Sequence, residues 1–253
     1  MMDKCKGLLG VFLLSGILLL PGCKAKIEER DAQIERNAVI YMGNRPIFYI
    51  DEGKGKTNYL LNNNEFIIPD NVFETYTLLV DNDIKKYGKN EIYGGLITKN
   101  LLLEDSKKEH FVNSLISSGY SPEWIIEFYK VLITRGNIIF KEKALQDSSF
   151  EESIIHERTH KFIRQLSPLE KNQIQKTYFS LKGKKGPKKP FINNREKYGG
   201  MITNIVNESW EEFFAYLVQG TLEDYVLDSL KVNSLETYKI YLEAKEKTKV
   251  CKF

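Results

Sequence analysis

Two kinds of hydrophobic pattern divide the chain. Short runs rich in β-branched and aromatic residues fill the segment after residue 38, whereas apolar residues at helical spacing dominate beyond Asp105. The short runs predict strands and the helical spacing predicts amphipathic helices, so the order favours an α+β fold with a small N-terminal mixed sheet and a mainly helical second part. The expected strands are 38–42, 46–50, 57–62, 65–69, 75–80 and 137–140, and the expected helices are 105–118, 122–135, 149–166, 168–181, 205–219, 222–231 and 234–248.

The first 23 residues have the pattern of an export signal. Two lysines precede an uncharged apolar run at 7–20, which is shorter than the ~20 residues that a bilayer-spanning helix needs. The run ends at Leu-Pro-Gly-Cys, which resembles the lipobox of bacterial lipoproteins and implies that Cys23 is lipidated. An uncleaved N-terminal anchor is the alternative. Both interpretations place the rest of the chain outside the cytoplasm, at a membrane surface.

Composition sets the expected domain boundaries and excludes one class of partner. Residues 24–37 are charged and poor in large apolar groups, which is typical of a stalk. We therefore expect a signal peptide at 1–22, a lipidated cysteine and stalk at 23–38, and one folded domain at 39–253. The 37 basic and 34 acidic side chains leave a net charge of only +3, so nucleic acid is a poor candidate partner.

The chemistry-bearing motif is a pair of histidines four residues apart. His156, Glu157 and His160 form an HExxH sequence in a chain that has only three histidines. On a helix, with 100° per residue, the two imidazoles lie about 40° apart and Glu157 projects beside them. Two neutral imidazoles one turn apart can bind one tetrahedral zinc ion, and the glutamate can accept a proton from water at that ion.

The residues around the motif predict the helix that it needs. Ser149 and Glu152 have the spacing of a capping box, which would begin a helix just upstream. Apolar residues follow at positions that place a buried stripe beside the histidines. Arg158 and Lys161 fall on the other side of the helix, which we expect to be solvated.

A third metal ligand is expected from an acidic residue on another helix. The segment after residue 206 offers Glu208, Glu211 and Glu212, and its large aromatic residues occupy the opposite face from Glu212. Ala215 follows Glu212 on the same side, where a small side chain would permit close approach to the histidine helix. The spacing alone leaves the choice among the three glutamates open.

An HExxH motif followed by a helical glutamate resembles the gluzincin branch of the zincin metallopeptidases. More narrowly, the sequence EEFFA at 211–215 is similar to a segment of the anthrax lethal factor catalytic domain and of the Pro-Pro endopeptidases. The resemblance implies a zincin-like fold and a Zn²⁺ ion held by His156, His160 and Glu212. It also implies that Glu157 is the general base.

The same resemblance implies a tyrosine that stabilises the oxyanion. Tyr198 is the nearest tyrosine before Glu212, but it lies 14 residues upstream, further than in the family pattern. Tyr216 stands where the family has an acidic residue. These two departures concern the surroundings of the metal and not the ligands themselves.

Together these features predict a membrane-tethered, extracytoplasmic zinc metallopeptidase, located at the cell surface or in the periplasm. Its substrate would be a peptide or protein, which we expect to add a strand to the sheet at 137–140. The alternatives are a non-catalytic surface lipoprotein, either a binding module or a degenerate zincin, and a metal-dependent hydrolase that acts on something other than peptides.

Overall fold

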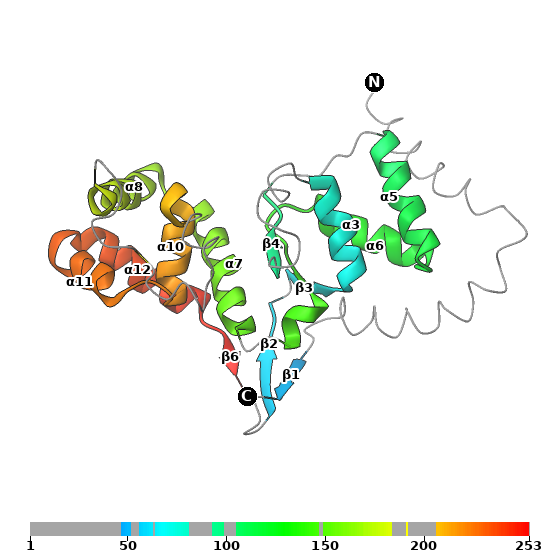
Figure 1. Ribbon diagram of the computed structural model, residues 1–253, viewed down its shortest axis with the longest axis horizontal. Helices are drawn as coiled ribbons and strands as arrows, with labels where there is room; N and C mark the ends of the chain where they lie inside the picture. Colours follow the sequence, from blue (N-terminus) through cyan, green and yellow to red (C-terminus); the bar gives the residue numbers. More distant parts are fainter. Residues whose placement is uncertain are drawn as a thin grey trace, which may run out of the picture. The chain divides into compact units, whose positions relative to one another are not determined.

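The computed structural model describes residues 47–51, 56–62, 64–80, 93–98, 105–146, 149–183, 191 and 206–252 (Figure 1). Cys23, the expected signal peptide and stalk, and the predicted strand 38–42 lie outside these residues. The chain divides into two compact units, residues 1–44 with 99–135 and residues 45–98 with 136–253. No helix among the described residues is both long enough and apolar enough to span a membrane.

The described part of the first unit is a pair of helices. The helices are α5 (Asp105–Ser117) and α6 (Pro122–Ile133), as the apolar spacing predicts. The side chain of Ser121 accepts a hydrogen bond from the backbone N–H of Trp124, which caps the start of α6. The Trp124 ring stacks on Phe128 one turn later, so α6 has an aromatic buried face.

The described residues of the second unit form two three-stranded sheets. In the first sheet, β2 (Lys56–Leu60) lies between β1 (Ile47–Asp51) and the C-terminal β6 (Cys251–Lys252), and both pairings are antiparallel. In the second sheet, β5 (Ile138–Lys141) lies between β3 (Glu65–Ile68), which is parallel to it, and β4 (Gly94–Leu96), which is antiparallel. The fold is therefore mixed α and β, with a small mixed sheet.

One predicted strand is wrong. Residues 75–80 belong to helix α3 (Asp70–Val80). Threonine, tyrosine and valine favour strands in isolation, but the buried positions Val72, Phe73, Tyr76 and Thr77 recur at helical spacing. Burial of that stripe therefore decides the conformation against the local propensity.

Helices make up most of the described residues of the second unit. A short 3-10 helix, Glu142–Gln146, follows β5, and it precedes α7 (Phe150–Gln165), α8 (Pro168–Lys182), α10 (Trp210–Gln219), α11 (Asp224–Asn233) and α12 (Leu235–Thr248). The predicted helix 205–219 is interrupted at Ser209, which caps α10. Figure 1 shows α7 and α10 side by side, and their contact is the most extensive between two helices of this unit. Their shared core includes Phe162, Ile163, Phe213, Phe214 and Leu217.

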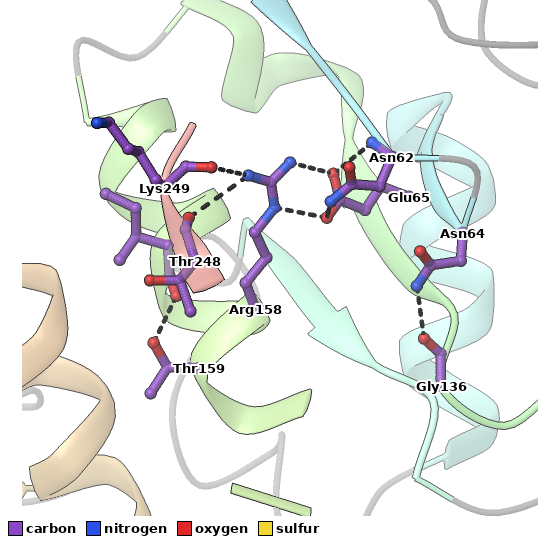
Figure 2. Close-up of polar contacts among 9 residues, drawn as sticks. Asn62, Asn64, Glu65, Gly136, Arg158, Thr159, Thr248 and Lys249 are labelled. Carbon is purple, nitrogen blue, oxygen red and sulfur yellow. Dashed lines mark hydrogen bonds and ion pairs between the residues drawn. The ribbon is translucent and has the colours of Figure 1, made fainter. Parts of the chain in front are cut away.

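A buried ion pair joins α7 to β3. Arg158 donates from Nε to Glu65 Oε1 at 2.6 Å and from Nη2 to Glu65 Oε2 at 2.8 Å, while its Nη1 donates to the Lys249 carbonyl at 2.7 Å, just beyond α12 (Figure 2). The Arg158 side chain is 7% exposed and that of Glu65 is 1% exposed. The expectation of a solvated Arg158 is therefore wrong, because a carboxylate from a distant strand and backbone carbonyls satisfy its guanidinium.

Candidate metal centre

Helix α7 presents the HExxH residues without the expected cap. Ser149 is the N-cap residue, but its side chain makes no capping hydrogen bond. Its ψ of 9° differs from the extended backbone that aims a cap hydroxyl at the first turn. The predicted capping box is thus wrong for α7, whose helical conformation is held by the burial of Phe150, Ile154, Phe162 and Ile163.

Helix α10 brings the candidate third ligand toward α7. The Ser209 side chain accepts from the Glu212 backbone N–H, which fixes the first turn, and Gly220 ends the helix in a left-handed conformation with φ of 91°. Ala215 is fully buried, so no large side chain holds the backbone of α10 away from its neighbours at that position. Glu212 is the residue that precedes the buried Phe213 and Phe214.

Three side chains converge between these helices. His156 Nε2 lies 3.3 Å from Glu212 Oε2, His160 Nε2 lies 3.2 Å from Glu212 Oε1, and the two Nε2 atoms are 3.1 Å apart. The exposed fractions of the side chains are 13% for His156, 15% for His160 and 27% for Glu212, so the cluster is mostly withdrawn from solvent but still accessible. These three groups can hold a metal ion.

Charge within the cluster is strongly coupled. Burial disfavours the His160 imidazolium, but the hydrogen bond to Glu212 and the negative charges of Glu212, Glu157 and Glu211 outweigh it and raise the pKa of His160 to about 9. Burial also disfavours the Glu212 carboxylate, but the two imidazoles outweigh that effect and hold the pKa of Glu212 far below its usual range. The cluster therefore favours an ionised carboxylate, which is the state that binds a metal ion.

A second set of contacts surrounds His156. Its Nδ1 lies 3.1 Å from Gln219 Oε1, and Gln219 Nε2 donates to Glu152 Oε2 at 3.3 Å. The Tyr216 ring lies against the His156 ring with 4.5 Å between centroids. Burial, with the charges of Glu212 and Glu157, raises the pKa of Tyr216, so its hydroxyl remains a neutral donor. Glu152 is predicted from the sequence only as part of the helix cap, and Gln219 is not predicted at all, although each lies at helical spacing from a predicted ligand.

The remaining predicted residues differ in position. Glu157 lies close enough to the cluster for its charge to raise the pKa of both His160 and Tyr216. Glu211 also acts on His160 through its charge, whereas Glu208 is exposed, and neither belongs to the group that can hold a metal. Tyr198 lies outside the described residues.

Comparisons with known proteins found no match that bears on the site. No protein-family model matches the chain, and neither a curated protein nor a solved structure matches it. The convergence of two imidazoles and a carboxylate is therefore the finding from which a function has to be argued.

Proposed function

We propose that this chain is a zinc-dependent peptidase whose metal is held by His156, His160 and Glu212. The proposal rests on the meeting of two imidazoles and a carboxylate from two helices: the two Nε2 atoms are 3.1 Å apart, and each lies 3.2–3.3 Å from a different oxygen of Glu212. Zinc bonds of ~2.0–2.1 Å at tetrahedral angles place neighbouring ligand atoms ~3.3–3.4 Å apart, which is close to the distance between the two Nε2 atoms and to the distance from each of them to its nearer Glu212 oxygen. Two imidazoles and one carboxylate are also a ligand set of catalytic zinc sites, which keep one position open.

The chain's own residues account for the proton transfers of hydrolysis. A bound zinc ion supplies Lewis acidity, which polarises a carbonyl group and acidifies water to a pKa of ~7. Glu157, next to the ligand His156, accepts the proton of the attacking water and then passes it to the leaving amine. Because its charge acts on His160 and Tyr216, the Glu157 carboxylate is close to the place where this transfer must occur.

A hydrogen-bond donor near the metal would assist this reaction, because an oxyanion develops on the carbonyl oxygen, and a neutral phenol can supply it. Tyr198 remains the candidate implied by the family resemblance. Tyr216 is a further candidate, since its ring contacts His156 and its raised pKa keeps the hydroxyl protonated at neutral pH. The two tyrosines are distinguished by separate substitution to phenylalanine.

The strand predicted to receive the substrate has no free edge, so a different strand is proposed. Residues 138–141 form β5, which is central in its sheet and already paired on both sides, so the expectation that 137–140 receives the substrate is wrong. The two edge strands among the described strands of that sheet are β3 and β4, and β4 has the more extensive contact with α7. We therefore place the added substrate strand at β4.

The proposed location follows the N-terminal sequence. Lipidation of Cys23 would tether the peptidase to a membrane, with the charged segment 24–37 as a spacer, and substrates would then be exported or extracellular peptides and proteins. Metabolic labelling with a fatty acid tests this part: wild type should incorporate the label, Cys23→Ala should not, and equal labelling of the two would contradict it.

The hydrolytic role is tested by Glu157→Gln. This variant should bind zinc as wild type does and should lose at least ~10²-fold in cleavage of a peptide library, because it lacks the general base. Glu151→Gln, a neighbouring glutamate on the same helix, is the matched control and should retain activity. Undiminished cleavage by Glu157→Gln would contradict the assigned role, and zinc binding without cleavage by wild type would favour a non-catalytic lipoprotein.

A further inference from the structure

His156 is held from outside the metal cluster by a chain of two hydrogen bonds. Gln219, the last residue of α10, presents Oε1 to His156 Nδ1 at 3.1 Å. An amide oxygen can only accept, so His156 Nδ1 must carry the proton. The other end of the amide fixes its orientation, because Gln219 Nε2 donates to Glu152 Oε2 at 3.3 Å and a carboxylate oxygen can only accept.

The proton on Nδ1 determines what His156 can do at Nε2. In a neutral imidazole with Nδ1 protonated, Nε2 carries a lone pair. His156 Nε2, which carries this lone pair, lies 3.1 Å from His160 Nε2 and 3.3 Å from Glu212 Oε2, inside the metal cluster. The hydrogen bond that His156 Nδ1 donates to Gln219 therefore selects the tautomer that binds a metal ion through Nε2.

We propose that Gln219 and Glu152 are positioning residues of the metal centre: a carboxylate–amide–imidazole relay that fixes the tautomer and ring orientation of His156. This inference rests on the proposed zinc site and adds two residues to it. Neither residue touches the metal or the substrate, and both act through His156.

Helical spacing explains how two helices supply the whole relay. Gln219 lies seven residues after Glu212, which is two turns, so both side chains leave the same face of α10. Glu152 lies four residues before His156, one turn earlier on the same face of α7. The relay thus runs from α7 to α10 and back to α7, and it links the relative placement of the helices to the direction of the ligand lone pair.

Tyr216 contributes a wall to the same arrangement. It lies between Glu212 and Gln219 in sequence and along the same face, and its ring contacts the His156 ring at 4.5 Å. The hydrogen bond to Gln219 therefore restricts rotation of the His156 ring, and the Tyr216 ring blocks movement of the imidazole on one side. A side chain so restrained loses little rotational freedom when it binds a metal ion.

The relay puts a neutral amide, and not a carboxylate, next to His156. The negative charge stands one group further away, on Glu152, where its effect on the imidazole passes through the amide. A carboxylate in contact with Nδ1 would raise the basicity of the ligand more. Exchanging the two groups, by Glu152→Gln together with Gln219→Glu, keeps the hydrogen bond that His156 Nδ1 donates to position 219 and reverses the second one, because the amide now at position 152 donates to the carboxylate at position 219.

Zinc affinity tests the relay, measured by competition with a chromophoric chelator. Gln219→Leu removes the acceptor and should weaken zinc binding by about 10–100-fold. Gln165→Leu, at an exposed position at the end of α7, is the matched control and should bind as wild type does. The exchanged pair should bind zinc at least as tightly as wild type, whereas Gln219→Glu alone places two carboxylates together and should bind more weakly than the pair.

Two results would overturn the relay, and they are distinct from failure of the metal site. Wild-type affinity in Gln219→Leu, or an exchanged pair that binds no better than Gln219→Leu, would refute it. The unfolding temperature of each metal-free variant separates lost folding from lost orientation, and if Gln219→Leu does not fold, the comparison between the exchanged pair and Gln219→Glu decides. If wild-type chain binds no zinc, the proposed function itself fails.

Discussion

Replacing Arg158 with methionine tests the physical account of how the histidine helix is held. Arg158 lies between the two histidines in sequence but points away from them, into a buried contact with Glu65 and the carbonyls at the end of α12 (Figure 2). Methionine keeps most of the length and apolar volume of the side chain. The substitution therefore removes the charge and the hydrogen bonds while it leaves little new space.

The magnitude follows from what remains around Glu65. Removing one partner of a buried ion pair costs ~3–5 kcal/mol, because the other charge stays buried without compensation. Asn62 still donates to both carboxylate oxygens, at 2.9 Å from its backbone N and 3.0 Å from Nδ2, which lowers the cost. The Lys249 carbonyl loses its hydrogen-bond donor, which raises the cost of the substitution. We expect a loss of ~3–4 kcal/mol, or ~6–16 °C in unfolding temperature for a unit of this size.

Urea unfolding, followed by circular dichroism, measures this loss. Arg164→Met, at an exposed position on the same helix, is the matched control and should change the free energy of unfolding by less than ~0.5 kcal/mol. Adding Glu65→Met to Arg158→Met should recover part of the loss, because no unpaired buried charge remains. An Arg158→Met protein as stable as the control, or a double variant in which the two losses simply add, would show that the buried ion pair does not hold α7 as described.

Four further predictions concern the site and the sheet. Zinc binding at pH 7 should release about one proton per chain, because the pKa of His160 is raised to about 9 and the metal must displace that proton; calorimetry in buffers of different ionisation enthalpy counts it, and release of none would contradict the coupling. Because the pKa of His160 is raised on folding, the metal-free chain should be more stable below pH 6.5 than above pH 9. Urea midpoints measured across this range should show the decrease in stability, and bound zinc should abolish it. Tyr216→Phe should lower kcat in peptide cleavage while zinc affinity stays within about threefold, and an unchanged kcat would return the oxyanion role to Tyr198. Gly94→Ala should lower the free energy of unfolding by ~1–3 kcal/mol, since the added Cβ would lie 2.6 Å from the ring of Phe140. Gly95→Ala, whose added Cβ meets nothing within 4 Å, should unfold at the wild-type urea concentration. Equal urea midpoints for the two variants would show that β4 does not pack on β5 as described.

The sequence was informative wherever a pattern is local. His156 and His160 are one helical turn apart, so their common face follows from the helix alone. The stripe of Phe213, Phe214 and Leu217 in the same way predicts which face of α10 is buried. Glu212 follows from the family resemblance, while the choice against Glu208 and Glu211 comes from the three-dimensional cluster.

The interactions that the sequence concealed are those between distant residues. Arg158 was expected in solvent because its partner, Glu65, is 93 positions away and nothing in either local pattern indicates the pairing. Gln219 forms no recognisable motif, and only the packing of α10 on α7 brings it to His156. Nor did the sequence indicate that β5 is central in its sheet, because β4, one of its two neighbours, has the sequence Gly-Gly-Leu, which has little preference for a strand.

Anomalous diffraction at the zinc absorption edge, from crystals of the chain grown with zinc, tests whether His156, His160 and Glu212 hold a zinc ion. We expect one strong peak per chain within about 2.0–2.2 Å of His156 Nε2, His160 Nε2 and a Glu212 carboxylate oxygen. That peak should disappear in Glu212→Gln and persist in Glu211→Gln. Zinc-free density between the three side chains, or a peak that survives Glu212→Gln unchanged, would contradict this ligand set.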